Sequence, residues 1–592
     1  MSKPSAPQRV VIVGGGLSGT LVAVHLLRQA PPGMIITLVE RQPPIGRGVA
    51  YATHACVHLL NVPAGRMSAF PDQPDHFLEW VRERLGRAGF PKTVGAEDFL
   101  PRCLYGDYLG YVLTEARQQA DPTVSFTVRV GEVVDIDELP AGGAARVFFS
   151  DDTTLVADQV VLALGNLPGE YPVRSGRRVF RGRRYVHVPW SPGVIDGIDA
   201  DAEVLIAGQG LTAIDIVIQL AERGHRGRIT CLSRRGLRPL PHRSGPDYPD
   251  FLAREPAPGT VRALVARVRA EVRRAAESGL DWGGVINALR PHSARLWAAL
   301  DWDERARFLR HVRPYWEVHR HRIAPEVAAR LQALVDAGRL EYLAGRFQHL
   351  EETDTGLRVV WRPRGAERDE ERHVAKLVNC TGPRTDYSKY QHPLFVNLLA
   401  RGLLDHDPLA LGVAATPEGR VKRYRGGVIP WLHTLGAPLR GVLWECGSAA
   451  EIRAQACSVA ERILAPDEQA KNPSRFERLV EDAKSRITEV SGAELQAELA
   501  AGEKPLLIDI REMEEHARGA IPGACHLPRG ILEGRIEQVA PDTGASIVLY
   551  CAGGNRSALA ADSLRCMGYG RVRSLAGGFA AWCRAAERRV AA

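Results

Sequence analysis

Residues 546–557, S-I-V-L-Y-C-A-G-G-N-R-S, contain the side chain of this sequence that is best suited to covalent chemistry. An apolar run predicts a buried strand, and a short loop then begins with Cys551 and ends with Arg556 before a helix. Successive loop amides and a helix N-terminus attract an anion, which favours the thiolate form of a cysteine. Cys551 is therefore a candidate nucleophile that can carry a sulfane sulfur as a persulfide, with Arg556 as its catalytic partner. The other loop residues expected around this sulfur are Ala552, Gly553, Gly554, Asn555 and Ser557.

A glycine-rich turn near the N-terminus has the spacing of a dinucleotide-binding loop. V-V-I-V-G-G-G-L-S-G, residues 10–19, leads from a buried strand into a helix. Gly14 allows the tight turn, Gly16 lets backbone approach a pyrophosphate, and Gly19 lets helix pack on strand. The next strand ends in Glu40, 26 residues after Gly14, where a carboxylate can accept hydrogen bonds from ribose hydroxyls. The predicted nucleotide-binding residues are Gly14, Gly16, Leu17, Ser18, Gly19, Glu40 and Arg41.

The same unit is repeated in V-L-I-A-G-Q-G-L-T-A, residues 204–213. Arg234 stands 26 residues after Gly208, at the offset that Glu40 has in the first unit. A carboxylate there would repel a 2′-phosphate, whereas arginine can bind one bidentately. The second site is therefore expected to take NADPH in preference to NADH, the alternative being that Arg234 is a solvated loop charge. The predicted residues of this site are Gly208, Gln209, Gly210, Leu211, Thr212, Arg234, Arg235 and Gly382.

Two such units in one chain predict an α/β protein with two Rossmann-like dinucleotide-binding folds, and the Cys551 stretch predicts a further, smaller α/β domain. Residues 123–165 predict a β-meander that returns to the first sheet and ends at Gly165. V-N-C-T-G-P, which ends just after Gly382, closes the second fold in the same way. Residues 248–340, rich in Arg, Ala and Leu at helical spacing, predict a helical insertion.

A helix is expected over residues 302–322 of this insertion. It would pack apolar side chains and use its arginines for structural ion pairs or for an anionic substrate; the packing residues are Phe308, Val312 and Trp316. Three histidines of this stretch lack a carboxylate or thiol to complete a metal site, so no metal is expected. They are His311, His319 and His321.

Composition places the chain among globular proteins of several domains. Its 592 residues are too many for one core, and 45% are hydrophobic and 25% charged. The net charge of +8 suits anionic ligands, but no recognition helix or basic tail points to nucleic acid. No apolar run approaches the roughly 18 residues of a membrane span, and no signal peptide precedes the first strand. Ten cysteines without a C-x-x-C pair are typical of a reducing cytoplasm, where we expect the protein to act.

An irregular apolar segment after the first unit carries a resemblance to a known family. G-V-A-Y-A-T at residues 48–53 and H-L-L-N-V-P-A-G-R-M-S at residues 58–68 resemble a bacterial family of FAD/NAD(P)-binding oxidoreductases, relatives of flavin-dependent N-hydroxylases and monooxygenases. The resemblance implies that FAD occupies the first glycine loop. W-E-C-G-S-A-A-E-I, residues 444–452, resembles the family's flavin-contacting turn and helix. The further FAD-binding residues so implied are Asn61, Gly165, Glu445 and Ile452.

F-R-G-R-R-Y-V-H-V-P-W, residues 180–190, resembles the linker signature of flavin monooxygenases, with His187 displaced by one position. Either the linker geometry is shared, or the stretch is a structural connector unrelated to oxygen chemistry.

The last 105 residues or so resemble a rhodanese domain, a sulfurtransferase fold. Asp509 and Arg511, the turn G-A-I-P-G-A, and L-A-G-G-F-A-A-W ending at Trp582 fit the pattern, and the C-x-x-x-x-R loop is shorter than that of related phosphatases. Ala520 stands where the family often has His, and Ala552 where many members carry a base. The second departure puts thiosulfate in doubt and favours a persulfide as donor. The alternative is an inactive rhodanese fold.

These resemblances suggest a division of the chain. Residues 1–195 would form the first part of an FAD domain, 196–393 an NAD(P)H domain with the insertion, 394–464 a return to the FAD domain, 465–486 a linker, and 487–592 the rhodanese domain.

The leading hypothesis is an FAD- and NADPH-dependent oxidoreductase fused to a sulfurtransferase that acts on a persulfide or a sulfur-bearing small molecule, supplied free or by a donor protein. A flavin disulfide reductase would need a thiol at the flavin. Cys56 is the nearby candidate, a core or surface thiol being the alternative, and the absence of C-x-x-x-x-C argues against a conventional dithiol reductase. The second hypothesis is a flavin-dependent N- or S-monooxygenase with an accessory or docking rhodanese domain. In a third, that domain is a non-catalytic sensor.

Overall fold

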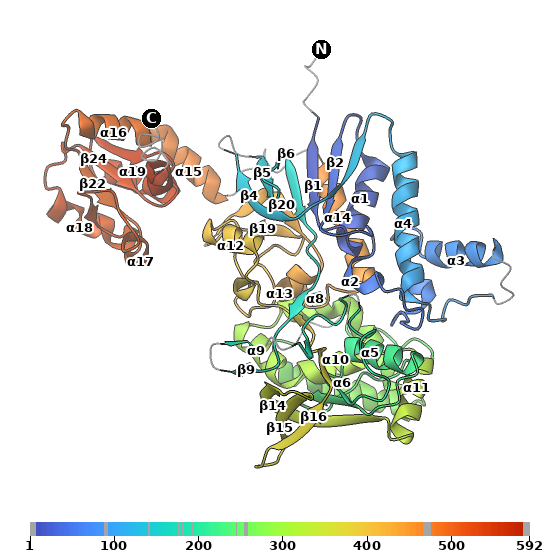
Figure 1. Ribbon diagram of the computed structural model, residues 1–592. Coiled ribbons are helices and arrows are strands. Elements are labelled where there is room, and N and C mark those ends of the chain that lie inside the picture. The colour runs from blue at the N-terminus through green and yellow to red at the C-terminus, as the bar shows by residue number, and fades with distance from the viewer. Residues whose placement is uncertain are drawn as a thin grey trace. The chain divides into compact units, whose positions relative to one another are not determined.

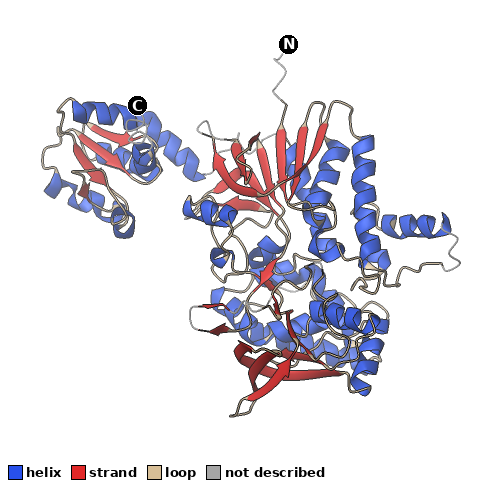
Figure 2. Cartoon of the chain, viewed as in Figure 1, coloured by secondary structure: helices blue, strands red, loops and turns tan. Residues whose placement is uncertain are grey.

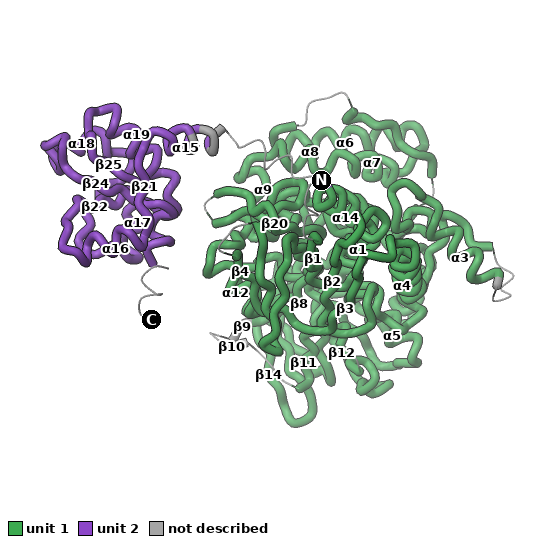
Figure 3. Tube along the Cα trace, turned by 90° about the horizontal axis from the view of Figure 1, so that it is seen from above, with its two compact units in different colours: residues 1–464 green, residues 465–592 purple. Residues whose placement is uncertain are grey.

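The computed structural model describes residues 7–87, 93–139, 143–175, 178–179, 183–191, 193–243, 245–253, 258–424, 426–465 and 475–583. The chain divides into two compact units, Met1–Leu464 and Ala465–Ala592 (Figure 3). The predicted α/β class is confirmed, because each unit is built on largely parallel sheets with helices on their faces (Figure 2). Among the described residues, no helix is long and apolar enough to cross a membrane.

The first nucleotide fold of unit 1 is built on a six-stranded sheet (Figure 1). Its strand order is β19-β20-β7-β1-β2-β3, and every pair except β19–β20 is parallel. The strands are β1 (Arg9–Val13), β2 (Ile35–Glu40), β3 (Ser125–Val130), β7 (Gln159–Leu162), β19 (Arg420–Lys422) and β20 (Val428–Thr434).

Both faces of this sheet are covered, which explains the unbroken apolar run of β1. Val10 and Ile12 face a core that contains α1, α4 and α14, whereas Val11 and Val13 face a core that contains β4, β5 and α12. The alternation is that of successive side chains in a strand. The covering elements are α1 (Leu17–Gln29), α4 (Arg102–Gln119), α14 (Ala449–Leu464), α12 (Pro393–Ala400) and the antiparallel strands β4 (Val133–Glu138), β5 (Ala145–Phe149) and β6 (Thr154–Ala157).

The β-meander predicted for residues 123–165 is confirmed for β4, β5 and β6, and the predicted return to the first sheet is confirmed by β7, but residues 125–130 do not belong to the meander. Ser125–Val130 instead pairs in parallel with β2, as in Ile36 opposite Phe126, and forms the edge of the main sheet. The chain reaches this edge through α4, which serves as the crossover that a parallel strand requires. Most side chains of β3 are exposed, so its sequence did not indicate a strand of the main sheet.

The second nucleotide fold of unit 1 has a seven-stranded sheet, in the order β11-β17-β12-β13-β14-β15-β16. The first five strands are parallel, and β14, β15 and β16 form an antiparallel extension. The strands are β11 (Tyr185–Val186), β12 (Val204–Ala207), β13 (Ile229–Ser233), β14 (Leu340–Glu352), β15 (Leu357–Pro363), β16 (Glu370–Val374) and β17 (Lys376–Asn379). Helices α5 (Leu211–Glu222) and α11 (Pro325–Asp336) contact each other and share a core with β12 and β13.

The helical insertion is smaller than predicted, and its main helix is broken. Helix α11 lies within the predicted range 248–340 but belongs to the nucleotide fold, where it leads into β14. The single helix expected over residues 302–322 is two, because Pro314 has no N–H and starts a new helix after Val312. The inserted helices are α6 (Val261–Glu277), α7 (Trp282–Leu289), α8 (Ser293–Ala298), α9 (Trp302–His311) and α10 (Arg313–Arg320).

A two-stranded antiparallel ribbon joins the two nucleotide folds. Strand β8 (Leu167–Gly169) follows β7 and pairs with β18 (Pro383–Arg384), which follows β17. The remaining elements of unit 1 are short or peripheral: α2 (Gly48–Tyr51), α3 (His76–Arg87), α13 (Arg440–Leu443), β9 (Arg174–Ser175) and β10 (Arg178–Val179).

Unit 2 has a five-stranded parallel sheet, in the order β21-β25-β24-β22-β23. Its strands are β21 (Thr488–Val490), β22 (Leu506–Asp509), β23 (Cys525–His526), β24 (Ile547–Tyr550) and β25 (Val572–Leu575). Its helices are α15 (Arg475–Arg486), α16 (Gly492–Ala500), α17 (Met513–His516), α18 (Leu532–Val539) and α19 (Asn555–Cys566). Helix α15, in the stretch expected to be a linker, contacts α19 and pairs Arg486 with Asp562 at 2.6 Å.

Candidate functional site

The first glycine loop lies at the carboxyl end of β1. Gly14 has a φ of +108°, and a Cβ at this position would lie 2.3 Å from the carbonyl oxygen of Ala163. A Cβ on Gly19 would lie 1.9 Å from the carbonyl oxygen of Gly14. Strand, loop and helix therefore approach so closely that neither position has room for a side chain.

The predicted ribose-binding acid lies beside this loop. The Gly15 N–H donates to Oε2 of Glu40 at 2.8 Å, and the Arg41 N–H donates to Oε1 of the same carboxylate at 2.8 Å. Helix α1 begins directly after Gly16, which has no side chain to cap the first-turn amides. A phosphate can satisfy these amides, so the loop fits a dinucleotide. Leu17 and Ser18 lie in this first turn.

The second glycine loop has the same backbone constraint as the first, but it carries the buried side chain of Gln209. Gly208 has a φ of +122°, and a Cβ there would lie 2.2 Å from the carbonyl oxygen of Cys380. The buried Gln209 donates from Nε2 to the carbonyl oxygens of Cys231 and Leu343, both at 2.8 Å. This side chain ties the loop to β13 and β14. Gly210 leaves the first turn of α5 without a side-chain cap, as Gly16 does for α1; Leu211 and Thr212 lie in that turn.

The two arginines after β13 have different surroundings. Arg235 donates to the carbonyl oxygen of Arg310 at 2.7 Å and is thereby tied to the insertion. Arg234 is exposed, and within the described ranges its guanidinium has no ion pair. It is therefore the arginine of this loop that can turn to a phosphate.

Gly165 and Gly382 have matching places. Their φ values are +61° and +91°, Gly165 follows β7 and Gly382 follows β17, and each has open space where a Cβ would stand. They turn the chain into β8 and β18, the ribbon between the two folds.

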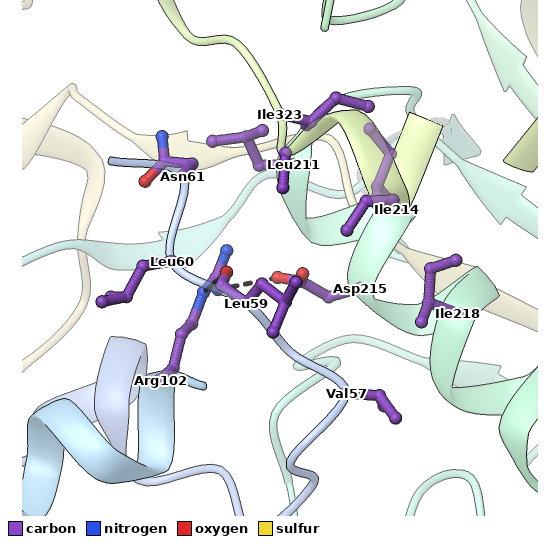
Figure 4. A pocket seen from close by; sticks show the side chains of 12 residues that line it. Val57, Leu59, Leu60, Asn61, Arg102, Leu211, Ile214, Asp215, Ile218 and Ile323 are labelled. Atoms are coloured by element: carbon purple, nitrogen blue, oxygen red, sulfur yellow. Dashed lines mark hydrogen bonds and ion pairs between the residues drawn. The ribbon is translucent and has the colours of Figure 1, made fainter. Parts of the chain in front are cut away.

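An apolar pocket lies where residues 57–61 of the first fold meet helix α5 of the second (Figure 4). Asn61, predicted to bind FAD, lines this pocket, and its carbonyl oxygen lies 3.0 Å from Nε2 of His242. Nη1 of Arg102 and Oδ2 of Asp215 face each other in the pocket at 2.7 Å. The motif that carries the family resemblance is thus part of the contact between the two nucleotide folds.

The Arg102–Asp215 pair is buried, and burial shifts the pKa values of Asp215 and of the neighbouring His58. Desolvation raises the pKa of Asp215 to about 6, although Arg102 acts in the opposite direction. His58 lies 3.1 Å from the carbonyl oxygen of Asp215 through Nε2 and 2.8 Å from Oγ1 of Thr53 through Nδ1. Burial, assisted by Arg102, lowers the pKa of His58 to about 4, so this imidazole is neutral at pH 7.

Glu445, also predicted to bind FAD, is held by the helical insertion. Its Oε1 accepts from Nε1 of Trp316 at 2.7 Å, and its Oε2 lies 3.3 Å from Nε of Arg320. Burial alone would raise the pKa of Glu445, but Arg320 and His321 hold it below its ordinary value. A neighbouring pair joins Arg290 to Glu451 at 2.6 Å. The arginines expected to form structural pairs or to bind an anion thus form pairs at the edge of the first fold.

The remaining FAD-binding prediction, Ile452, lies on α14. Its side chain approaches Gly436, where a Cβ would lie 3.9 Å from Ile452 Cδ1 and 3.1 Å from Ser18 Oγ. It therefore packs near the first turn of α1.

The linker signature is described except for residues 180–182. His187 stacks on Tyr171 with ring centroids 4.0 Å apart, and its Nδ1 lies 3.2 Å from the hydroxyl of Tyr185. Trp190 makes an edge contact with His58 at 5.8 Å. Tyr185 and Val186 of this stretch form β11 at the edge of the second sheet, and Trp190 contacts the first fold. No cluster of three metal-ligating side chains exists among the residues that the structure describes.

In unit 2, Cys551 stands at the carboxyl end of the central strand β24. Its Sγ accepts the Gly554 N–H at 3.1 Å and lies 3.7 Å from the hydroxyl of Ser557. The residue is 1% exposed, whereas Ala552, Gly553 and Asn555 of the same loop are exposed. A ligand of this sulfur must therefore approach through the loop itself.

Arg556 is fixed beside this sulfur by a carboxylate. Its Nη1 and Nη2 donate to Oε2 and Oε1 of Glu515 at 3.0 and 2.9 Å. The hydrogen bonds to Glu515 and the proximity of Cys551 raise the pKa of Arg556, so its positive charge is permanent. The bidentate pair sets both the position and the plane of the guanidinium.

Asp509 and Arg511 form a buried support below the loop. Nη2 of Arg511 pairs with Oδ2 of Asp509 at 2.6 Å and with the carbonyl oxygen of Gly519 at 2.6 Å. The glycines of L-A-G-G-F lie on the other side: a Cβ on Gly578 would lie 2.3 Å from the carbonyl oxygen of Cys551. The Arg511 guanidinium also lies over the rings of Tyr550 and Phe579, at 5.6 and 4.3 Å from their centroids, and the Phe579 N–H donates to the carbonyl oxygen of Cys551 at 2.8 Å.

Comparison with known proteins agrees with this geometry. Residues 491–585 match the rhodanese-like domain family. Over 98 residues the chain is 40% identical to a sulfurtransferase of Allochromatium vinosum, a match that covers 17% of this chain and 90% of that protein. The chain belongs to the rhodanese family through its C-terminal unit. The rhodanese domain is thus confirmed.

The N-terminal unit matches a second family. Residues 11–167 match the FAD-NAD(P)-binding family, so the first glycine loop lies in an FAD/NAD(P)-binding domain. The fold resembles that of the ornithine N-hydroxylase of Kutzneria sp. 744, solved with reduced FAD, NADP⁺ and L-ornithine, at a TM-score of 0.52 and 17% identity over 79% of this chain and all of that one. Over 245 residues the chain is 26% identical to nitrosuccinic acid synthase of Aspergillus oryzae, covering 37% of this chain and 36% of that protein.

Three residues of these sites were not predicted from the sequence. Asp215 is an acid within the apolar helix sequence L-T-A-I-D-I-V-I, and that contrast was a usable signal of a buried charge. Arg102 and Glu515 gave no such signal, because each is one charged residue among several in an ordinary amphipathic stretch.

Replacing Arg102 by Met tests the buried pair. We expect a loss of about 3 kcal/mol in the free energy of unfolding at pH 8, because Asp215 must then be buried unpaired or be protonated. The loss should shrink at pH 5. The pKa of Asp215 is about 6 in the folded state and 3.8 in the unfolded state, so ionisation of this group destabilises the fold as the pH rises. At pH 5 the folded protein holds Asp215 as the neutral acid, which does not need Arg102 as a partner. Urea unfolding at both pH values measures this.

Arg330→Met is the matched control. Arg330 pairs with Glu222 of the same helix α5 at 2.6 Å, but both side chains are largely exposed. We expect a loss of about 0–1 kcal/mol that does not change between pH 5 and pH 8. Equal losses for the two variants, or a pH-independent loss for Arg102→Met, would contradict the assignment.

Glu515→Gln tests the clamp on Arg556 in the rhodanese domain. The amide keeps the shape but cannot accept both guanidinium hydrogen bonds, so we expect sulfur transfer from a low-molecular-weight persulfide to cyanide to slow about tenfold. Glu514→Gln, at the exposed neighbour in α17, should keep the parent rate. An unchanged rate in Glu515→Gln, with thermal unfolding unchanged, would show that Arg556 needs no clamp.

Proposed function

We propose that this protein is an FAD- and NADPH-dependent oxidoreductase whose rhodanese domain carries sulfane sulfur on Cys551, and that the flavoprotein unit acts on a persulfide or another sulfur-bearing small molecule. The observation that carries the proposal is the Cys551 loop, in which a buried sulfur faces the Gly554 amide and Arg556. This loop shares one chain with two dinucleotide-binding loops.

The loop chemistry follows from its donors. The Cys551 thiolate attacks the terminal sulfur of a hydropersulfide R–S–SH, the S–S bond breaks, and R–SH leaves after taking up a proton. The Gly554 N–H, the positive Arg556 and the start of α19 hold the negative charge of the resulting Cys551 persulfide. Ala552 adds no cation for the second charge of thiosulfate, which supports a hydropersulfide as donor.

The flavoprotein unit supplies the redox part. FAD binding at the first loop is supported by Gly14 and Gly19, which have no room for a Cβ, and by the Glu40 carboxylate, which accepts the Gly15 N–H beside the loop. Bound FAD would supply two-electron transfer from NADPH to the substrate. At the second loop, Arg234 is available to the 2′-phosphate of NADPH, whereas Arg235 is held by the insertion.

A second candidate is a flavin-dependent N- or S-monooxygenase with the rhodanese domain as an accessory or docking module. The fold similarity to an ornithine N-hydroxylase favours it, and so does the arginine-rich insertion. Arg320 is buried, and its Nη2 lies 3.6 Å from a carboxylate oxygen of Glu451. A substrate carboxylate could complete its coordination.

Arg234→Ser tests the coenzyme preference. We expect the KM for NADPH to rise about tenfold or more, because one charge-assisted contact to the 2′-phosphate is lost, while the KM for NADH stays constant. Steady-state flavin reduction with both coenzymes measures this. Arg238→Ser, which changes another arginine of the same loop, separates a local effect from a general loss of charge. A parallel rise for NADH would refute the 2′-phosphate role.

Rapid-mixing spectroscopy tests the proposed function directly. The FAD-loaded protein is reduced with NADPH, and its reoxidation is followed anaerobically with glutathione persulfide and separately with oxygen. We expect the persulfide to reoxidise it and Cys551→Ser to slow this reoxidation about a hundredfold, because the variant cannot form the persulfide intermediate. Cys566→Ser, at the exposed end of α19, should behave as the parent protein.

The two candidate functions give opposite results. A monooxygenase would be reoxidised by oxygen, would yield an oxygenated amine or thiol product, and would keep the same rate in Cys551→Ser. This result would refute the coupled sulfur enzyme and support the monooxygenase.

A further inference from the structure

Two cysteines that are far apart in the sequence meet in unit 1. The Sγ of Cys103 donates to the Sγ of Cys56 at 3.8 Å. Cys56 is exposed and Cys103 is half-buried, so solvent and small molecules reach the pair. Among the described residues, no other hydrogen bond joins two cysteine sulfurs.

The backbone already holds the two segments together. The Arg102 N–H donates to the carbonyl oxygen of His58 at 2.8 Å, and the Leu60 N–H donates to that of Leu100 at 2.8 Å. Leu59 stands opposite Pro101 in an antiparallel bridge. To form a disulfide bond of about 2.05 Å, the sulfurs need to approach by less than about 2 Å, which side-chain rotation can supply while these hydrogen bonds persist.

The two thiols are not equivalent. Burial, together with the contact to Cys56, raises the pKa of Cys103, which keeps that residue a protonated donor. Cys56 is the accepting sulfur of the pair and the one exposed to solvent. This asymmetry is that of an attacking and a resolving cysteine.

We propose that Cys56 and Cys103 are a redox-active dithiol that accepts the sulfane sulfur of a hydropersulfide, releases it as hydrogen sulfide and closes to a disulfide. The Cys56 thiolate attacks the terminal sulfur of R–S–SH, and the S–S bond breaks to leave R–SH. Cys103 then loses its proton and attacks the Cys56 sulfur, and HS⁻ leaves and takes up a proton. Two thiols lose two electrons and two protons, and the sulfane sulfur gains them.

This activity rests on the proposed function only in taking a hydropersulfide as substrate, since it requires neither Cys551 nor the flavin. It gives the sulfur chemistry of unit 1 a defined site.

The position of the pair gives its oxidation a structural consequence. Cys103 follows Arg102 in the chain, and Cys56 precedes His58 by two residues. Arg102 and His58 are the side chains that hold Asp215 of helix α5. A disulfide would therefore restrain two residues of the first fold that bind Asp215 of the second.

The test uses the full-length, FAD-loaded protein, reduced with dithiothreitol, desalted and mixed anaerobically with glutathione persulfide. Free sulfide is measured, and peptide mapping detects the Cys56–Cys103 disulfide. We expect one sulfide released for each disulfide formed. In Cys103→Ser a persulfide should accumulate on Cys56, with sulfide release at least about tenfold slower, and Cys56→Ser should show neither product. Cys457→Ser, at a half-buried cysteine on α14, should match the parent protein.

Cys551→Ser separates the two proposals. If this variant still forms the disulfide and releases sulfide, the dithiol site is supported. If Cys551 of the parent protein takes up no sulfur, the proposed function is refuted, but the dithiol proposal is not. The dithiol proposal is overturned if glutathione persulfide leaves both cysteines reduced. This holds even if oxidised glutathione, added in a separate reaction, forms the Cys56–Cys103 disulfide. It is overturned equally if Cys56→Ser releases sulfide at the parent rate.

Discussion

The buried ion pair between Arg102 and Asp215 is the contact on which the arrangement of the flavoprotein unit depends. Arg102 begins a helix of the first nucleotide fold, and Asp215 lies on the first helix of the second. Removing either partner would leave an uncompensated charge buried between the folds that carry the two glycine loops. His58, neutral through burial, adds a further bond to the backbone of the same helix.

A second constraint recurs in all three α/β folds. At the carboxyl end of a central strand, one backbone approaches another so closely that a Cβ cannot fit: Gly14 against Ala163, Gly208 against Cys380, and Gly578 against Cys551. The constraint exists because the ligand-binding edge of a parallel sheet lies where strands end and helices begin. In the first two folds this edge leaves the first-turn amides of α1 and α5 without a side-chain cap, and in the third the Gly554 amide donates to the sulfur of Cys551.

Much of the fold could be predicted because its signals are local. The two strand–loop–helix units, Glu40 at the end of β2, and the C-x-x-x-x-R loop each lie within a few tens of residues, and their chemistry follows from residue type and spacing. The extent of the insertion was predicted less well. Helix α11 has the same periodicity as the inserted helices, and only its packing on α5 assigns it to the nucleotide fold. The helix break before α10 could have been predicted from Pro314, but the prediction used hydrophobic periodicity alone.

The sequence by itself determined the fold class and predicted the two glycine loops and Cys551 as a candidate nucleophile, because each depends on backbone geometry that a few consecutive residues impose. The tertiary structure alone decided which side chains meet across those elements. It placed Glu515 on Arg556, Glu445 on the insertion rather than in an open site, Arg102 on Asp215, and Cys103 on Cys56. Such pairs join residues from 41 to 129 positions apart, for example Glu515 with Arg556 and Trp316 with Glu445. No periodicity or motif encodes them, since they form only when elements that are distant in the sequence pack together.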